Sequence, residues 1–242
     1  MNAFVWLLKR EYWEHRGGFF WAPIWAGIVI FVLTLLGAIT GEVGMRRSGI
    51  SFGGRTLGDI TSHMAPEDLA RLGSGIDMAL YTLCGIFAIV LFFVTFFYLL
   101  GALYDDRRDR SVLFWKSLPL SDLETVLSKV VTAIVVAPLF SAAAAIALMF
   151  AFLALVSVFV AFHGVNPVTT IWLTASPLSV AIKILALLPI NALWALPCVG
   201  WLLLVSAFAK RAPFLWAVAV PVVAGVAGLT RDLRLFEVAP GV

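Results

Sequence analysis

The chain has 242 residues, of which 62% are hydrophobic and 13% are charged, whereas soluble domains have roughly 45–50% apolar and about 25% charged residues. So few charges cannot cover a surface in contact with water, and the composition therefore predicts that lipid solvates much of the chain. The net charge of +3 does not point to nucleic acid, because the lysines and arginines lie at the ends of apolar runs, where they orient a chain in a membrane. Cys84 and Cys198 each lie inside an apolar run, which excludes a disulfide framework and a CxxC metal pair.

Five long apolar runs predict an all-α, polytopic membrane protein with five spans, because about 20 helical residues cross a hydrocarbon layer of ~30 Å. The third and fourth runs exceed this length, so we expect them to tilt or to kink, at Pro138 in the third run and at Pro189 and Pro197 in the fourth. A hairpin that turns near Pro189 and Asn191 is an alternative for the fourth run. The predicted spans are Phe19 to Thr40, Met78 to Tyr104, Val130 to Phe162, Leu178 to Ala209 and Pro213 to Leu229.

The lysines and arginines of the short connecting segments predict the orientation of the chain. Ten of them fall on one side of the membrane if the spans alternate, which makes that side, and the amino terminus with it, cytoplasmic. The loop from His163 to Pro177 contains neither residue type and is expected outside. The ten residues are Lys9, Arg10, Arg16, Arg107, Arg108, Arg110, Lys116, Lys129, Lys210 and Arg211.

Residues 1–18 predict an amphipathic helix that lies in the cytoplasmic interface of the membrane. The helical spacing of Phe4, Val5, Leu8 and Tyr12 gives it an apolar face, and its tryptophan, lysine and arginine side chains suit headgroup depth. Such a helix can serve only as an anchor, or it can also support a docking surface.

The outer loop from Gly41 to Asp77 contains the segment APEDLARLG. Pro66 suits a first helical position, two acidic residues follow in the first turn, and Gly73 suits a helix stop. We therefore predict a short helix at the outer surface, which can be a solvated cap without a ligand.

The central loop, residues 105–129, gives the strongest functional signal. Ser111 can cap a short helix that Pro119 ends, and Ser121 with Glu124 forms a capping box that begins the next helix. An apolar and aromatic surface rimmed by charges is typical of a site that a protein partner binds, although these side chains can instead dip into the bilayer interface. The residues expected on this surface are Leu113, Phe114, Trp115 and Leu118.

Here the chain resembles the ABC type-2 permeases, the membrane subunits of ATP-binding-cassette exporters. The resemblance rests on KREYWEHR near the start, on LYDDRRDRSVLFWKSLPLSDLETVLSK from Leu103 to Lys129, and on the layout of spans around them. It implies a transmembrane permease domain over residues 19–242 that pairs with a second permease copy or a paralogue and binds two cytoplasmic ATPase subunits. It also implies that Ser111 to Leu118 forms the coupling helix, and that the chain resides in a bacterial inner membrane. The family usually has six spans, whereas five are predicted here.

The sequence shows no motif whose residues could carry enzyme chemistry. It has no G-x-x-x-x-G-K-[ST] phosphate loop, so we expect ATP and magnesium to bind in a partner subunit and no cofactor to bind in this chain. It also lacks H-E-x-x-H and G-x-S-x-G motifs.

Polar and small residues inside the spans are candidates for a substrate pathway or for helix packing. Lys183 can attract an anionic substrate group or extend to the interface, and Asn191 can line a pathway or bond the carbonyl that Pro189 leaves free. The GxxxG pair Gly37 and Gly41 suits close helix contact, as does a stripe of alanines. The stripe consists of Ala143, Ala147 and Ala151.

These observations predict a permease subunit that moves a hydrophobic or amphipathic substrate by alternating access, as a homodimer or heterodimer with cytoplasmic ATPases. One alternative is an ion-coupled secondary transporter, for which acidic residues near the midplane of the membrane would be expected. The other is a membrane subunit that only anchors or regulates a partner.

Overall fold

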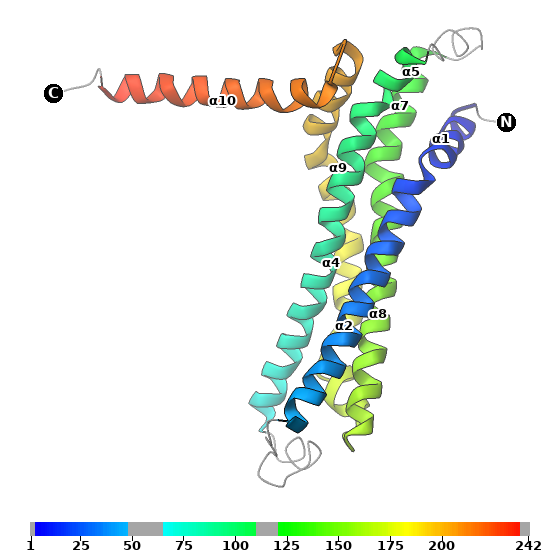
Figure 1. Cartoon of the computed structure of the whole chain (residues 1–242), viewed down its shortest axis with the longest axis vertical. Coiled ribbons are helices and arrows are strands. Elements are labelled where there is room, and N and C mark those ends of the chain that lie inside the picture. Colours follow the sequence, from blue (N-terminus) through cyan, green and yellow to red (C-terminus); the bar gives the residue numbers. More distant parts are fainter. Residues whose placement is uncertain (1–2, 48–64, 110–120, 238–242) are drawn as a thin grey trace. The chain divides into compact units, whose positions relative to one another are not determined.

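The computed structural model describes residues 3–47, 65–109 and 121–237, and within these ranges it contains helices and turns but no strand (Figure 1). The predicted all-α class is therefore confirmed. In chain order the elements are α1 (Ala3–Glu14), the π-helix η1 (Gly17–Trp21), α2 (Ala22–Arg47), α4 (Pro66–Ala102), α5 (Tyr104–Arg108), α7 (Asp122–Val131), the π-helix η2 (Thr132–Val136), α8 (Ala137–Phe162), the π-helix η3 (Val168–Trp172), α9 (Pro177–Phe208) and α10 (Pro213–Glu237).

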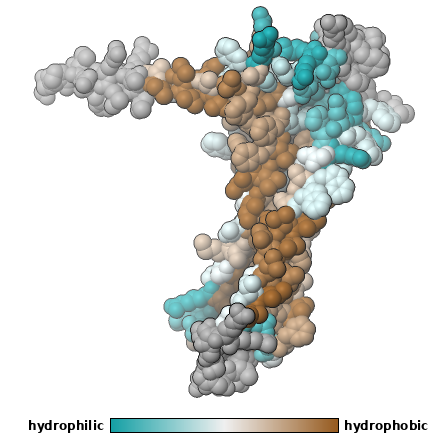
Figure 2. Space-filling view, viewed as in Figure 1, coloured by the Kyte–Doolittle hydropathy of each residue, from teal (hydrophilic) through white to brown (hydrophobic). Residues whose placement is uncertain are grey.

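Four helical stretches of the described chain are long and apolar enough to cross a membrane, and they contain the first four predicted spans almost entirely. Many of their large apolar side chains are exposed, as Figure 2 shows, which agrees with lipid as the surrounding solvent. The fifth predicted span lies in α10, where side chains are described only as far as Ala227, and the stretch Pro213–Ala227 is by itself shorter than a span. A fifth crossing therefore stays a prediction. The four stretches are Gly17–Gly44, Pro66–Arg108, Asp122–Phe162 and Pro177–Phe208.

The chain forms two compact units. One comprises Met1–Glu11, Thr95–Ile134 and Trp194–Val242, and we call it the charged unit because it holds a buried cluster of charged side chains. The other, the apolar unit, comprises Tyr12–Val94 and Val135–Leu193.

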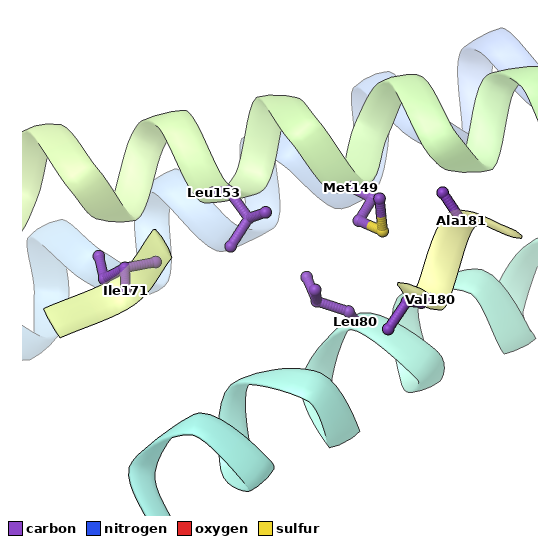
Figure 3. Close-up of a cluster of buried hydrophobic side chains, with 6 residues drawn as sticks. All are labelled: Leu80, Met149, Leu153, Ile171, Val180 and Ala181. Atoms are coloured by element: carbon purple, nitrogen blue, oxygen red, sulfur yellow. The ribbon is translucent and has the colours of Figure 1, made fainter. Parts of the chain in front are cut away.

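The core of the apolar unit brings α4, α8, η3 and the start of α9 together. Leu80, Met149 and Leu153 are completely buried there, and Ile171 and Val180 nearly so (Figure 3). A second cluster around Phe87 packs against side chains of α2. Aliphatic burial of this kind stabilises by about 25 cal/mol per Å² of area removed from water, but in lipid the gain comes mainly from close packing.

Proline has different effects in the two long runs that contain it. The π-helix η2 ends at Val136, two residues before Pro138, which has no N–H to donate and so cannot continue the regular pattern of hydrogen bonds. A π-helical turn therefore lies next to Pro138, and the kink itself stays a prediction. α9, by contrast, continues as one helix through Pro189 and Pro197, and the hairpin alternative is wrong.

The prediction of a short outer helix that ends at Gly73 is also wrong. Pro66 is the first residue of α4, as predicted, but the helix continues through Gly73 to Ala102. A Cβ atom added at Gly73 would overlap the backbone carbonyl of Thr174. The glycine therefore allows another segment to approach the helix closely instead of ending it.

The GxxxG pair and the alanine stripe were expected to make close contacts with another helix, and within the described chain they do not. A Cβ atom at Gly37 or Gly41 would meet nothing within 4 Å. Ala147 and Ala151 line a shallow groove between α2 and α8, and Ala143 is exposed.

Candidate functional site

The charged unit contains a buried cluster of ionic side chains centred on Glu11. Successive turns of α1 place Leu7 and Glu11 on one helix face, and both are buried. Three residues of the predicted apolar face, Phe4, Leu8 and Tyr12, are half-buried, and only Val5 is exposed, at 58%. The sequence reasoning thus missed Glu11, whose signal was an acidic residue four positions after a leucine in an apolar helix.

Glu11 accepts three hydrogen bonds from side chains on different elements. Its Oε1 accepts from Arg10 Nη2 at 2.7 Å and from Lys129 Nζ at 3.1 Å, and its Oε2 accepts from the Tyr98 hydroxyl at 2.9 Å. Tyr98 lies near the end of α4 and Lys129 lies in α7. The carboxylate therefore joins α1 to two helices that follow it by 87 and 118 positions.

Lys129 connects the cluster to α5. Its Nζ also lies 3.1 Å from Asp106 Oδ2, and its side chain is only 2% exposed. The four groups Arg10, Glu11, Asp106 and Lys129 carry compensating charges, which is the condition under which buried ions are tolerated. The sequence analysis read Lys129 only as a residue that orients the chain.

The partners of Glu11 decide its protonation. Burial alone would raise the pKa of this carboxyl, but the positive charge of Lys129 and the hydrogen bonds from Arg10, Tyr98 and Lys129 outweigh burial, and the pKa is lowered from its ordinary value. Glu11 is therefore ionised at neutral pH and holds its partners as an anion.

A second polar contact fixes the break between α4 and α5. Ser206 Oγ donates to the Leu100 carbonyl at 2.8 Å and accepts from the backbone N–H groups of Leu103 and Tyr104 at 3.0 Å each. The hydroxyl satisfies backbone groups that the end of α4 leaves without helical partners. The helix break is thus held in place by a side chain of α9.

Arg107 connects the same short helix to the end of α9. Its Nη2 donates to the carbonyl oxygens of Ser206 at 2.6 Å and Ala209 at 3.0 Å. A cation at these carbonyls is favourable, because the carboxyl end of a helix carries partial negative charge. Two neighbouring residues of α5, Asp106 and Arg107, therefore tie it to α7 and to α9.

The other flank of the central loop is also fixed. Ser121 and Glu124 form the predicted capping box: Ser121 Oγ accepts from the Glu124 N–H at 3.2 Å, and the Glu124 carboxylate accepts from the Ser121 N–H at 3.1 Å. The predicted partner-binding residues themselves, Ser111, Leu113, Phe114, Trp115 and Leu118, lie outside the residues that the structure describes.

The two predicted pathway residues are both exposed on α9. Lys183 and Asn191 are eight positions apart, which separates them by about 12 Å along the helix, so the structure does not bring them together. Within residues 3–47, 65–109 and 121–237, no three histidine, cysteine or acidic side chains are grouped in a way that could hold a metal ion.

Comparison with protein-family models, with curated proteins and with solved structures finds no match to this chain.

Proposed function

We propose that this chain is the permease subunit of an ATP-driven exporter of the ABC type-2 class that it resembles. It moves a hydrophobic or amphipathic substrate across the membrane by alternating access, while separate cytoplasmic subunits hydrolyse ATP. The four long apolar helices support a membrane role.

The observation that carries the proposal is the ionic link between the two flanks of the central loop. Asp106 precedes residues 110–120 of the loop and Lys129 follows them, and the two form an ion pair at 3.1 Å in which Lys129 is buried and Asp106 is 17% exposed. Lys129 also binds Glu11 of α1. A partner that displaces the loop would therefore move α1, α5 and α7 together, as rigid-body switching requires.

The remaining roles follow from this proposal. Residues Ser111 to Leu118, which lie outside the described part of the chain, are proposed to couple to the ATPase subunits. Lys183 and Asn191 face the substrate pathway, where their exposure leaves them open to a second permease copy or a paralogue. The chain lies in a bacterial inner membrane with its amino terminus in the cytoplasm.

The first experiment identifies the partner and its activity. The chain is purified in a mild detergent, co-purifying subunits are identified, and phosphate release is measured for the chain alone and for the complex. We expect hydrolysis only in the complex, because this chain has no phosphate loop. Robust hydrolysis by the pure chain contradicts the proposal, and transport driven by an ion gradient without any ATPase supports the secondary transporter.

A matched pair of variants tests the ionic link itself. Asp106→Asn removes the charge that Lys129 binds, whereas Asp109→Asn removes an exposed charge three residues later. We expect both variants to bind the ATPase, and only Asp106→Asn to reduce ATP-dependent substrate transport. If both variants transport the substrate at the same rate, the ionic link does not transmit motion. If wild type also fails to transport, the alternative of a subunit that only anchors or regulates a partner is favoured.

A further inference from the structure

A groove between the end of α9 and the first turns of α10 lies wholly within the charged unit. Its volume is about 550 Å³, within the range of small-molecule sites in proteins. The lining residues are Trp201, Leu204, Val205, Phe208, Ala209, Lys210, Trp216 and Val220.

Specific contacts hold the two walls of the groove. Trp201 Nε1 of α9 donates to the Ala217 carbonyl of α10 at 3.2 Å, and Ala217 is buried. The Phe214 ring packs edge-on against Phe96 of α4, with ring centroids 6.1 Å apart. The end of α9 is in turn bound by Arg107. The groove is therefore a built feature of the unit and not a gap beside a loose helix.

The chemistry of the groove combines a long apolar wall with a cation at one end. Leu204, Phe208 and Trp216 are 51%, 76% and 58% exposed, respectively, so a ligand can reach them. Among the described residues that line the groove, Lys210 alone is charged, and the next residue, Arg211, is exposed beside it. An apolar chain with an anionic head matches both features.

We propose that this groove binds an anionic phospholipid, with one acyl chain along Leu204, Phe208 and Trp216 and the phosphate at Lys210. Basic side chains at the mouth of an apolar pocket between membrane helices select lipids by headgroup charge, and tryptophan favours the same boundary depth. The site uses this chain alone, and so it stands independently of the proposed transport function.

The test measures lipid retained by the full-length chain. The protein is purified in neutral detergent with an equimolar mixture of phosphatidylglycerol and phosphatidylcholine, and bound lipid is counted by native mass spectrometry. We expect preferential retention of phosphatidylglycerol, and a loss of that preference by about fivefold in Lys210→Gln, which is the effect of about one basic side chain at a lipid surface. Arg108→Gln, which removes an exposed cation outside the groove, should retain the preference.

A second pair of variants tests the apolar wall. Leu204→Trp fills the groove and should abolish lipid retention, whereas Leu215→Trp adds the same ring at an exposed position of α10 that does not line it. Thermal unfolding is measured for both variants as the control for correct folding. Equal retention of the two lipids by wild type, or unchanged retention in Lys210→Gln, overturns the proposal. If Leu204→Trp changes the number of protein copies in the particle and leaves the amount of bound lipid unchanged, a second copy of the chain occupies the groove. The lipid proposal is then wrong.

Discussion

Glu11 and Lys129 lie 118 positions apart in the sequence, yet the Lys129 ammonium donates to the Glu11 carboxylate at 3.1 Å, with both side chains almost fully buried. The attraction between two buried charges is roughly offset by the cost of removing them from water, so such a pair contributes little net stability. The pair does favour one arrangement of the helices, because a buried Glu11 or a buried Lys129 without its partner is unfavourable. The pair therefore specifies how α1 docks against α7.

The first prediction concerns the loss of one charge. Lys129→Met leaves Glu11 and Asp106 without their shared cation and should lower the free energy of unfolding by about 3–5 kcal/mol, as for other broken buried pairs. Lys183→Met, which removes an exposed lysine of α9, should change it little. Reversible unfolding in detergent gives both values. The double variant Glu11→Gln with Lys129→Met should lose less than the sum of the two single losses, and strict additivity would show that the pair is not coupled.

The second prediction is a dependence of stability on pH. The pKa of Glu11 is lowered on folding, so as the pH falls the unfolded chain takes up this proton first. The stability that the ionised carboxyl contributes is therefore complete above the ordinary value of 4.5 and is lost as the pH falls through the lower folded value. The difference in melting temperature between wild type and Glu11→Gln should be constant at neutral pH and should shrink only below about pH 4.5. A difference that shrinks between pH 7 and pH 5 would contradict this assignment.

The third prediction separates two glycines of α4. Gly73→Ala places a methyl group against the Thr174 carbonyl, and we expect a loss of about 1–3 kcal/mol in the free energy of unfolding. Gly75→Ala, two residues later, meets nothing within 4 Å and should be neutral or stabilising by up to about 1 kcal/mol, because alanine favours helix. Equal effects in unfolding experiments would mean that the close approach at Gly73 does not exist.

The fourth prediction concerns topology. Single cysteines at Asp109 and Asn166, in a background lacking Cys84 and Cys198, should react with impermeant thiol reagents from opposite sides of the membrane. Asp109 should be reached from the cytoplasm and Asn166 from outside. Labelling of both from one side would overturn the orientation inferred from the lysines and arginines.

The fifth prediction concerns the partner surface and rests on sequence alone, since these residues lie outside the described part of the chain. Phe114→Ala or Trp115→Ala should weaken binding of the proposed ATPase partner by ~2 kcal/mol or more, because buried aromatic residues dominate interface energies. Arg108→Ala, at the exposed rim, should cost no more than about 1 kcal/mol. Pull-down of the partner and ATPase rates at matched membrane expression measure the effect. Wild-type binding and rates in both aromatic variants would show that this segment rests on lipid.

Local patterns in the sequence predicted the helices well. The lengths of the apolar runs located the four long helices, and Ser121 with Glu124 located the start of α7, because each of these signals involves residues within a few turns of one another. Such features depend on backbone hydrogen bonding and on the thickness of the membrane, and both can be evaluated from a short window of sequence.

Only the tertiary structure decided which charges pair and which helix faces are covered. The sequence marked Lys129 as a cation at the end of a run, but its partners Glu11 and Asp106 come from other segments of the chain. Gly73 read as a helix stop because its local pattern is that of a stop, whereas the close approach of Thr174 gives the glycine its role. Side chains that meet across helices depend on rotation and register, which small packing differences settle and which no local pattern encodes.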